Sequence, residues 1–294
     1  MTIDQFRHGA QIPPQKAERC PLLFSAAFLL ISVIVFHSIC NYIYLSKCVC
    51  LYHRDCLQHM SITLLFHDRL LHIGNGAFPF FQKLTMIWNL ITDWNLTSRV
   101  YPNFFHLIPA IYTLWTGFDP VLVTMSNMIY YAILVWSVYR IGTVCQSRGT
   151  GLLAAVLVSF FPDIYGVSTK WTPDFPCIAF VALSLCFLIQ SDFFRSRKYS
   201  LLFGFSAGLG IPFRFQVVIF VIGSFAHSAT RLIGALFTQG AARDRGEKRR
   251  VAVNLFSALT LWILIAGFFM FPNFSFLPGQ RNRAPAPFEI SKGW

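Results

Sequence analysis

Carboxylate side chains are the groups in this sequence most able to do chemistry, because only 12 of its 294 residues are acidic. A carboxylate in or beside a membrane is costly unless it is used, so the positions of the acids are informative. A carboxylate at a membrane surface can take the proton of an attacking hydroxyl group, which speeds a reaction by about 10²–10⁴-fold. The acids that we expect on one side, the external side, are Asp55, Asp68, Asp93, Asp163, Asp174 and Glu289. Any chemistry is therefore expected on that side.

Residues with metal-ligand chemistry follow the first apolar run closely: Cys48, Cys50, His53, Cys56 and His59. Thiolates and imidazoles can hold zinc, but zinc sites usually separate paired ligands by about two to four residues and have a second pair further along the chain. This segment has neither the usual Cys spacing nor a second half-site. We expect no metal or other cofactor, a divalent cation included. A disulfide among Cys48, Cys50 and Cys56 is the better interpretation if the segment faces an oxidising compartment.

The composition indicates the environment in which these residues work. Hydrophobic residues make up 55% of the chain, charged residues only 12%, and the mean hydropathy is +0.55. Soluble domains are about a quarter charged, so a water-soluble globular protein is excluded. The 24 Lys and Arg residues do not indicate nucleic-acid binding, because outside a short cluster at 243–250 they fall between apolar runs. The sequence predicts an all-α polytopic membrane protein whose surroundings are the lipid bilayer.

Seven apolar runs are candidate membrane spans. Several are shorter than the roughly 20 residues needed to cross a bilayer, so the predicted ends of these spans are approximate. The segment after the first run is too polar to cross, but its apolar patches are typical of helices that lie in the interface. We expect a single membrane domain, 1–294, with a cytoplasmic N-terminus at 1–21, an external loop with interfacial helices at 46–118, an external tail at 272–294, and spans at 22–45, 121–139, 151–165, 175–189, 201–211, 215–228 and 251–271.

Basic residues between the runs orient the chain. With the N-terminus inside, alternation puts the segments near 140–148, 195–198 and 231–250 in the cytoplasm, and these hold most of the bases in short connections. The opposite short connections hold only Lys170 and Arg214. This bias follows the positive-inside rule. We expect a multi-pass protein of the inner cell membrane or, in a eukaryote, of the endoplasmic reticulum.

Ordered landmarks in the chain resemble one family of membrane enzymes. They are His67-Asp68-Arg69-Leu70-Leu71-His72, Tyr101-Pro102-Asn103-Phe104, Gly117-Phe118-Asp119-Pro120, Ser168-Thr169-Lys170-Trp171-Thr172-Pro173-Asp174, and Gly204-Phe205-Ser206-Ala207-Gly208-Leu209-Gly210 running into Arg214. Together they are similar to GT-C glycosyltransferases of the dolichyl-phosphate-mannose protein mannosyltransferase type. The GT-C-like region extends over residues 60–225.

The resemblance implies a reaction and its partners. Such enzymes move a sugar from a polyprenyl-phosphate carrier to a hydroxyl group of a protein, lipid or polysaccharide on the outer or luminal face. The resemblance implies that Asp68 is the general base and that Asp174 is the second catalytic acidic position. The departing phosphate needs cations beside it. Arg can donate two parallel hydrogen bonds to phosphate oxygens, whereas Lys acts as a point charge. The substrate- and phosphate-binding candidates are Arg69, His72, Tyr101, Lys170 and Arg214, with Lys170 and Arg214 favoured.

Simpler interpretations stand beside these assignments. Asp174 could serve only as a helix N-cap, because it follows Pro173 ahead of an apolar run. Arg69 could pair with Asp68 and weaken it as a base. Lys170 and Arg214 could be interfacial anchors with their stems along lipid. Members of the resembled family usually continue through further spans, so a catalytically inactive, truncated GT-C remnant is one alternative, and a membrane transporter or lipid-handling protein is another.

Overall fold

The computed structural model describes residues 21–47, 54–92, 104–237 and 242–274, and every regular element within them is a helix. This confirms the all-helical fold that the sequence predicts. The helices are α2 (Pro21–Lys47), α3 (Arg54–Asn75), α4 (Phe80–Thr92), α5 (Phe104–Thr116), α6 (Pro120–Met125), α7 (Asn127–Cys145), α8 (Arg148–Ser159), α9 (Pro162–Ser168), α10 (Asp174–Gln190), α11 (Arg197–Gly210), α12 (Val217–Phe237) and α13 (Ala242–Phe274).

Three helical segments of the described chain are long and apolar enough to cross a membrane: Ala26–Lys47, Pro120–Cys145 and Gly246–Met270. A fourth is present if α8 and α9, which are bent by 60° at their junction, act as one span. α10 and the first part of α12 are apolar but shorter. The chain is therefore a polytopic membrane protein, and the count of seven spans stays a prediction.

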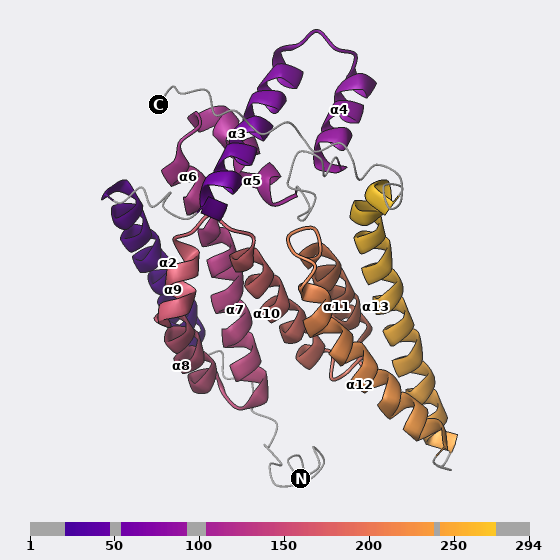
Figure 1. Ribbon diagram of the computed structural model, residues 1–294. Helices are drawn as coiled ribbons and strands as arrows, with labels where there is room; N and C mark the ends of the chain where they lie inside the picture. The colour runs from indigo at the N-terminus through magenta and orange to yellow at the C-terminus, as the bar shows by residue number, and fades with distance from the viewer. Residues whose placement is uncertain (1–20, 48–53, 93–103, 238–241, 275–294) are drawn as a thin grey trace.

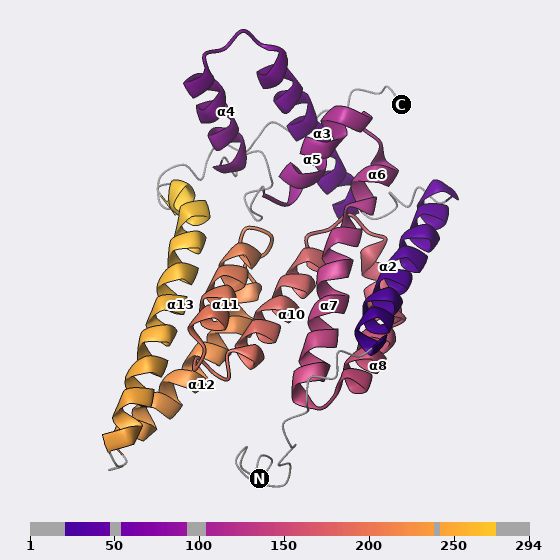
Figure 2. The ribbon, with the colours of Figure 1, turned by 180° about the vertical axis from the view of Figure 1, so that it is seen from behind.

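The long helices run side by side and alternate in direction between two ends of the molecule (Figures 1 and 2). α7 runs away from the end that carries α3 to α6, α8 and α9 return towards it, and α10 to α13 repeat this alternation (Figure 1). The turns at 169–173 and 211–216 thus lie at the same end as α3 to α6, which we call the outer end. The turns at 146–147 and 191–196 lie at the opposite, inner end.

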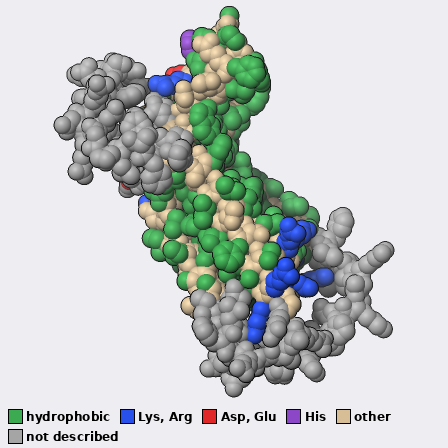
Figure 3. Space-filling view, turned by 90° about the vertical axis from the view of Figure 1, so that its right-hand side faces the viewer, with side chains coloured by type: hydrophobic (Ala, Val, Ile, Leu, Met, Phe, Trp, Pro, Cys, Tyr) green, Lys and Arg blue, Asp and Glu red, His purple; other side chains and the backbone are tan. Residues whose placement is uncertain are grey.

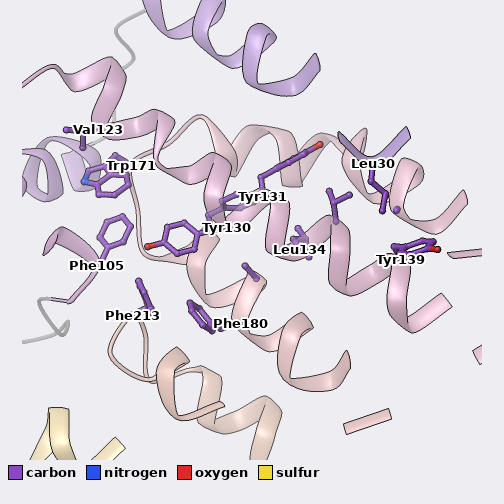
Figure 4. Close-up of a cluster of buried hydrophobic side chains, with 14 of the residues drawn as sticks. Leu30, Phe105, Val123, Tyr130, Tyr131, Leu134, Tyr139, Trp171, Phe180 and Phe213 are labelled. Atoms are coloured by element: carbon purple, nitrogen blue, oxygen red, sulfur yellow. The ribbon is translucent and has the colours of Figure 1, made fainter. Parts of the chain in front are cut away.

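Aromatic side chains fill the space where α7, α10 and the 211–216 turn meet. Tyr130, Tyr131, Trp171, Phe175 and Phe213 are each 2% exposed or less. The side chains of this core come from separate helices and turns and point into one cluster (Figure 4). In lipid, helices are held together by close packing of this kind rather than by exclusion from water. The core therefore fixes the turns at the outer end relative to one another.

The described residues of the segment predicted as an external loop form a layer of helices at the outer end. α3 packs against α5 through Ile62, Phe66, Leu107 and Ala110, all 9% exposed or less. α4 returns alongside α3 and exposes most of the Phe81 ring, which is 80% exposed. The short helices that the apolar patches predict in this region are confirmed, and they bring α3 and α5 over the ends of α7 and α10 (Figure 1).

Candidate active site

An ion pair at the outer end of the bundle joins Asp174 to Arg214. Asp174 begins α10 directly after Pro173, so its carboxylate lies where the helix dipole favours negative charge. Arg214 lies in the turn between α11 and α12, and its Nε donates a hydrogen bond to the side-chain oxygen of Gln216 at 3.0 Å. α10 begins at Asp174, as the apolar run predicts, but its N-cap residue is Pro173 and no side chain caps it, so the interpretation of Asp174 as the N-cap is wrong. The structure also brings together two residues that the sequence singled out separately.

Asp55 and His59, in the first two turns of α3, lie close to this ion pair. His59 is 6% exposed, and its burial lowers the pKa of its imidazole to about 4. The charge of Asp55 raises this pKa and the charge of Arg214 lowers it further. The His59 ring also meets Phe105 at 5.8 Å, and Phe105 stacks on Trp171 at 3.9 Å, three residues before Asp174. We call Asp55, His59, Asp174 and Arg214 the outer charged cluster.

A buried hydrogen-bonded chain continues from His59 into the protein. Nδ1 of His59 lies 3.4 Å from Nε2 of His106, and Nδ1 of His106 lies 2.8 Å from the hydroxyl oxygen of Thr63. The same oxygen accepts a hydrogen bond from Nε1 of Trp171 at 3.0 Å. Burial holds the pKa of His106 well below its usual value, and the neighbouring His59 lowers it further. The chain links α3, α5 and the turn before α10, and so fixes His59 relative to Asp174.

Buried aromatic side chains pack next to Arg214. Phe213, next to Arg214, stacks on Phe180 with ring centroids 5.0 Å apart and meets Tyr130 edge to face at 5.5 Å. Phe104 of α5 meets the same Phe213 ring at 5.4 Å. Charges beside apolar walls interact more strongly than charges in water. This packing fixes the turn that carries Arg214, whose guanidinium is partly exposed beside the Asp174 carboxylate.

Asp68 lies on the same helix as Asp55, but in the C-terminal half of α3. The two residues are about three and a half turns apart, or about 20 Å along the helix axis. Asp68 is exposed. Arg69 and His72, which follow it, line a hollow of about 310 Å³ between α3 and α4. These three candidates therefore lie together on the outer half of α3, apart from the outer charged cluster, and the assignment of Asp68 as the base stays a prediction.

Lys170 and Tyr101 complete the predicted set. Lys170 is exposed in the turn before α10, and its backbone carbonyl accepts a hydrogen bond from Nδ2 of Asn127 at 2.8 Å. Tyr101 lies outside the described residues, as do Cys48 and Cys50, so the predicted disulfide also stays a prediction. Within the described ranges, no three His, Cys, Asp or Glu side chains gather as a metal ion would require.

Asp55 and His59 are the members of the cluster that reasoning from sequence missed as site residues. The sequence offered Asp55 only as one acid among several and His59 only as a possible metal ligand. The signal that could have found them is their spacing of four residues at the start of the first helix after the first span. Residues four apart lie on the same helix face.

Comparison with known proteins bears on what the cluster does. The model of the family described as dolichyl-phosphate-mannose-protein mannosyltransferase matches residues 101–239, nearly half of the chain. The matched range contains Lys170, Asp174 and Arg214 but neither Asp55 nor Asp68. No curated protein and no solved structure matches the chain. Residues 101–239 thus match the dolichyl-phosphate-mannose-protein mannosyltransferase family, and this match indicates a membrane glycosyltransferase of the GT-C type.

Proposed function

We propose that the protein transfers a sugar from a polyprenyl-phosphate carrier to an acceptor hydroxyl group, with the outer charged cluster as the reaction centre. The observation that carries the proposal is the ion pair of Asp174 and Arg214 beside Asp55 and His59. Two of these four residues lie in the part of the chain that matches the family, whose description names a dolichyl-phosphate-linked sugar. The donor class is proposed for this chain by analogy with that description.

In this proposal Asp55 is the general base. It accepts the proton of the acceptor hydroxyl while the hydroxyl oxygen attacks the anomeric carbon of the sugar. The bond from that carbon to the phosphate oxygen breaks, and the lipid phosphate leaves with the electron pair. A base must reach the attacking hydroxyl while the phosphate lies beside a cation. Asp55 is favoured over Asp68 because it lies one helical turn before His59, and His59 is linked through His106 and Thr63 to Trp171 in the turn before Asp174.

Arg214 is proposed to bind the departing phosphate. A guanidinium carries N–H donors in a planar fork that matches phosphate oxygens. Asp174 and Gln216 hold that fork in orientation, which makes Asp174 a positioning residue for Arg214. Lys170, exposed in the turn directly before α10, adds a second positive charge on the same side.

A pair of matched substitutions on one helix tests the proposal. Asp55→Asn and Asp68→Asn each remove one carboxylate of α3 without changing its size. Membranes of the producing cell supply acceptors, and radiolabelled polyprenyl-phosphate mannose and glucose serve as donors. Asp55→Asn should lower transfer by about 10²–10⁴-fold, the contribution that a general base makes. Asp68→Asn should leave transfer nearly unchanged, because its carboxylate lies away from the cluster.

The amount and the melting temperature of each variant in detergent show whether it folds. If Asp68→Asn abolished transfer while Asp55→Asn retained it, the base would be Asp68 and the proposed arrangement would be wrong. Uptake of the sugar into vesicles without a covalent product would instead identify a transporter. No transfer by the folded natural chain with any donor is the result that an inactive remnant would give.

A further inference from the structure

A long apolar groove runs along α13 towards the inner end of the bundle. It has a volume of about 580 Å³, and one stripe of α13 from Arg249 to Leu264 forms most of it, with Leu201 of α11 beside it. The stripe is about 22 Å long, given a helical rise of 1.5 Å per residue. That is more than half of a hydrocarbon core about 30 Å thick. The groove therefore has the length of an acyl chain that lies in one leaflet.

Two hydroxyl side chains, Ser257 and Thr260, lie within the otherwise apolar middle of the groove. Ser257 donates its hydroxyl hydrogen to the backbone carbonyl of Val253 at 2.8 Å, so its own helix satisfies this donor. The neighbouring side chains of the stripe are apolar, Phe256 being 66% exposed and Leu264 64% exposed. An occupant of this part of the groove would therefore be hydrocarbon rather than a sugar or a peptide backbone.

The inner end of the groove carries positive charge. Arg249 lines the groove there, and Arg250, which follows it, is exposed. Arg197 and Lys198 are exposed on α11, one helical turn before Leu201. Figure 3, which views the molecule from the side of α12 and α13, shows Lys and Arg side chains gathered at the lower end of a largely hydrophobic face. We call these four residues the inner basic group.

The two acids near the inner basic group whose side chains are described pair with Arg195. Asp192 and Glu247 both pair with Arg195, at 2.9 Å and 2.7 Å. Among the described side chains, no carboxylate forms an ion pair with any member of the inner basic group. An anionic head group at the end of the apolar groove would therefore supply the missing negative charge.

We propose that this groove binds an anionic phospholipid of the inner leaflet, with an acyl chain along α13 and the phosphate between Arg249 and Lys198. Basic pockets between transmembrane helices on the cytoplasmic side are suited to phospholipid head groups. Arg contributes a planar fork for phosphate oxygens and Lys a compact charge. The groove lies at the opposite end of the bundle from Arg214, so it is distinct from the site proposed for the lipid-linked sugar.

Native mass spectrometry of the full chain tests this inference with two probes of the same acyl chains, phosphatidylglycerol and phosphatidylcholine. The natural chain should retain phosphatidylglycerol about tenfold more tightly. The double variant Arg249→Gln, Lys198→Gln should lose most of that preference. Ala252→Trp fills the groove next to the head-group end without changing charge, and it should weaken retention of phosphatidylglycerol by about as much. Arg148→Gln, an exposed base at the same end of the bundle, is the matched control and should bind as the natural chain does.

Melting temperatures without added lipid show that the variants fold. Equal retention of the two lipids by the natural chain would overturn the inference. So would a loss of preference in Arg148→Gln as large as that in the double variant, because binding would then follow overall charge. Displacement of bound phosphatidylglycerol by an equimolar polyprenyl phosphate would overturn it as well, since the groove would then be a site for the carrier lipid.

Discussion

At the scale of single residues, the candidate site depends on one hydroxyl group. The oxygen of Thr63 accepts a hydrogen bond from Trp171, meets Nδ1 of His106 and lies 2.9 Å from the backbone oxygen of His59, to which it can donate. This single atom therefore connects the turn before α10 with α5 and α3. Without it, buried donors on two of these segments would lose their partner.

Thr63→Val keeps the shape of the side chain and removes the hydroxyl. The free energy of unfolding should fall by about 1–3 kcal/mol for each buried polar group that is left unsatisfied. Sugar transfer per folded molecule should fall as well, because His59 is no longer fixed beside Asp55. Thermal unfolding in detergent and the transfer assay check the two effects, and Thr63→Ser should restore both.

Thr113→Val is the matched control for this change. The Thr113 hydroxyl lies 2.9 Å from Nδ1 of His67, so the same kind of bond joins the same two helices further from the cluster. This variant should lose stability but keep transfer per folded molecule. Equal losses of transfer in both valine variants would show that the hydrogen bonds act only on folding.

The two buried imidazoles predict that acid weakens the fold. The pKa of His59 is about 4 in the folded protein and about 6.5 in the unfolded chain, so the unfolded chain binds more protons as the pH falls between these values. The stability contributed by the neutral ring is fully present above about pH 6.5 and decreases towards pH 4. Burial shifts the pKa of His106 in the same direction.

The melting temperature should therefore decline between about pH 7 and about pH 4.5, the range in which the unfolded imidazoles gain protons. His106→Gln should make this decline shallower, because one titrating ring is gone. An unchanged pH dependence in that variant would show that other groups cause the loss.

The sequence predicted one half of the candidate site and missed the other for a physical reason. Asp174 and Arg214 follow from the landmarks and from the end of an apolar run. Whether Asp55 or Asp68 lies near Arg214 depends on how α3 lies across the bundle. Both residues are on this one helix, several turns apart, so the sequence does not distinguish them. The way α3 lies depends on contacts from a distant segment, such as the stacking of Phe105 on Trp171 at 3.9 Å, and no local sequence pattern reports such contacts.

At the scale of helices, the apolar runs predicted the bundle well because backbone groups in lipid must be satisfied within a helix. The run at 175–189 is almost identical with α10, Asp174–Gln190. The external layer was predicted less well. The first apolar patch there is at 62–66, whereas α3 begins at Arg54. The polar first turns of α3 are held by contacts with α5 and the 169–173 turn, and hydropathy does not reveal such contacts.

The close approach of α11 to α13 gives a prediction at this scale. A Cβ atom added to Gly204 would lie 2.3 Å from the backbone oxygen of Ala258, so the two helices would have to move apart. Gly204→Ala should destabilise the protein by about 1–3 kcal/mol, the usual cost of overpacking. Gly223→Ala on α12 is the control, because no atom lies within 4 Å of its added Cβ.

The control should be neutral or stabilising by up to about 1 kcal/mol, since Ala favours helices over Gly. Thermal unfolding of both variants in the same detergent makes the comparison. If the Gly204→Ala and Gly223→Ala variants had the same melting temperature, the contact between α11 and α13 would not be a close one.

At the scale of the whole molecule, the described Lys and Arg residues are more numerous at the inner end of the bundle than at the outer end. Asp55, Asp68 and Asp174 belong to the outer end, whereas Arg148 and the inner basic group belong to the inner end. The positive-inside rule then predicts that the inner end faces the cytoplasm. The same orientation puts the outer charged cluster on the side where a lipid-linked sugar would meet its acceptor and puts the apolar groove on α13 in the inner leaflet.

Labelling of single cysteines in intact cells tests this orientation. In a chain without other cysteines, Cys145 is exposed at the inner end of α7, and Phe81→Cys takes the place of a ring that is 80% exposed on α4. A maleimide that does not cross membranes should label the cysteine at position 81 in intact cells or sealed luminal-side-out vesicles, and should label Cys145 only after permeabilisation. A charged reagent reaches a thiol only through water, so labelling reports the side and not the depth. The reverse pattern would put the bases outside and the carboxylates inside, and both the reaction site and the inner-leaflet lipid site would then face the wrong compartment.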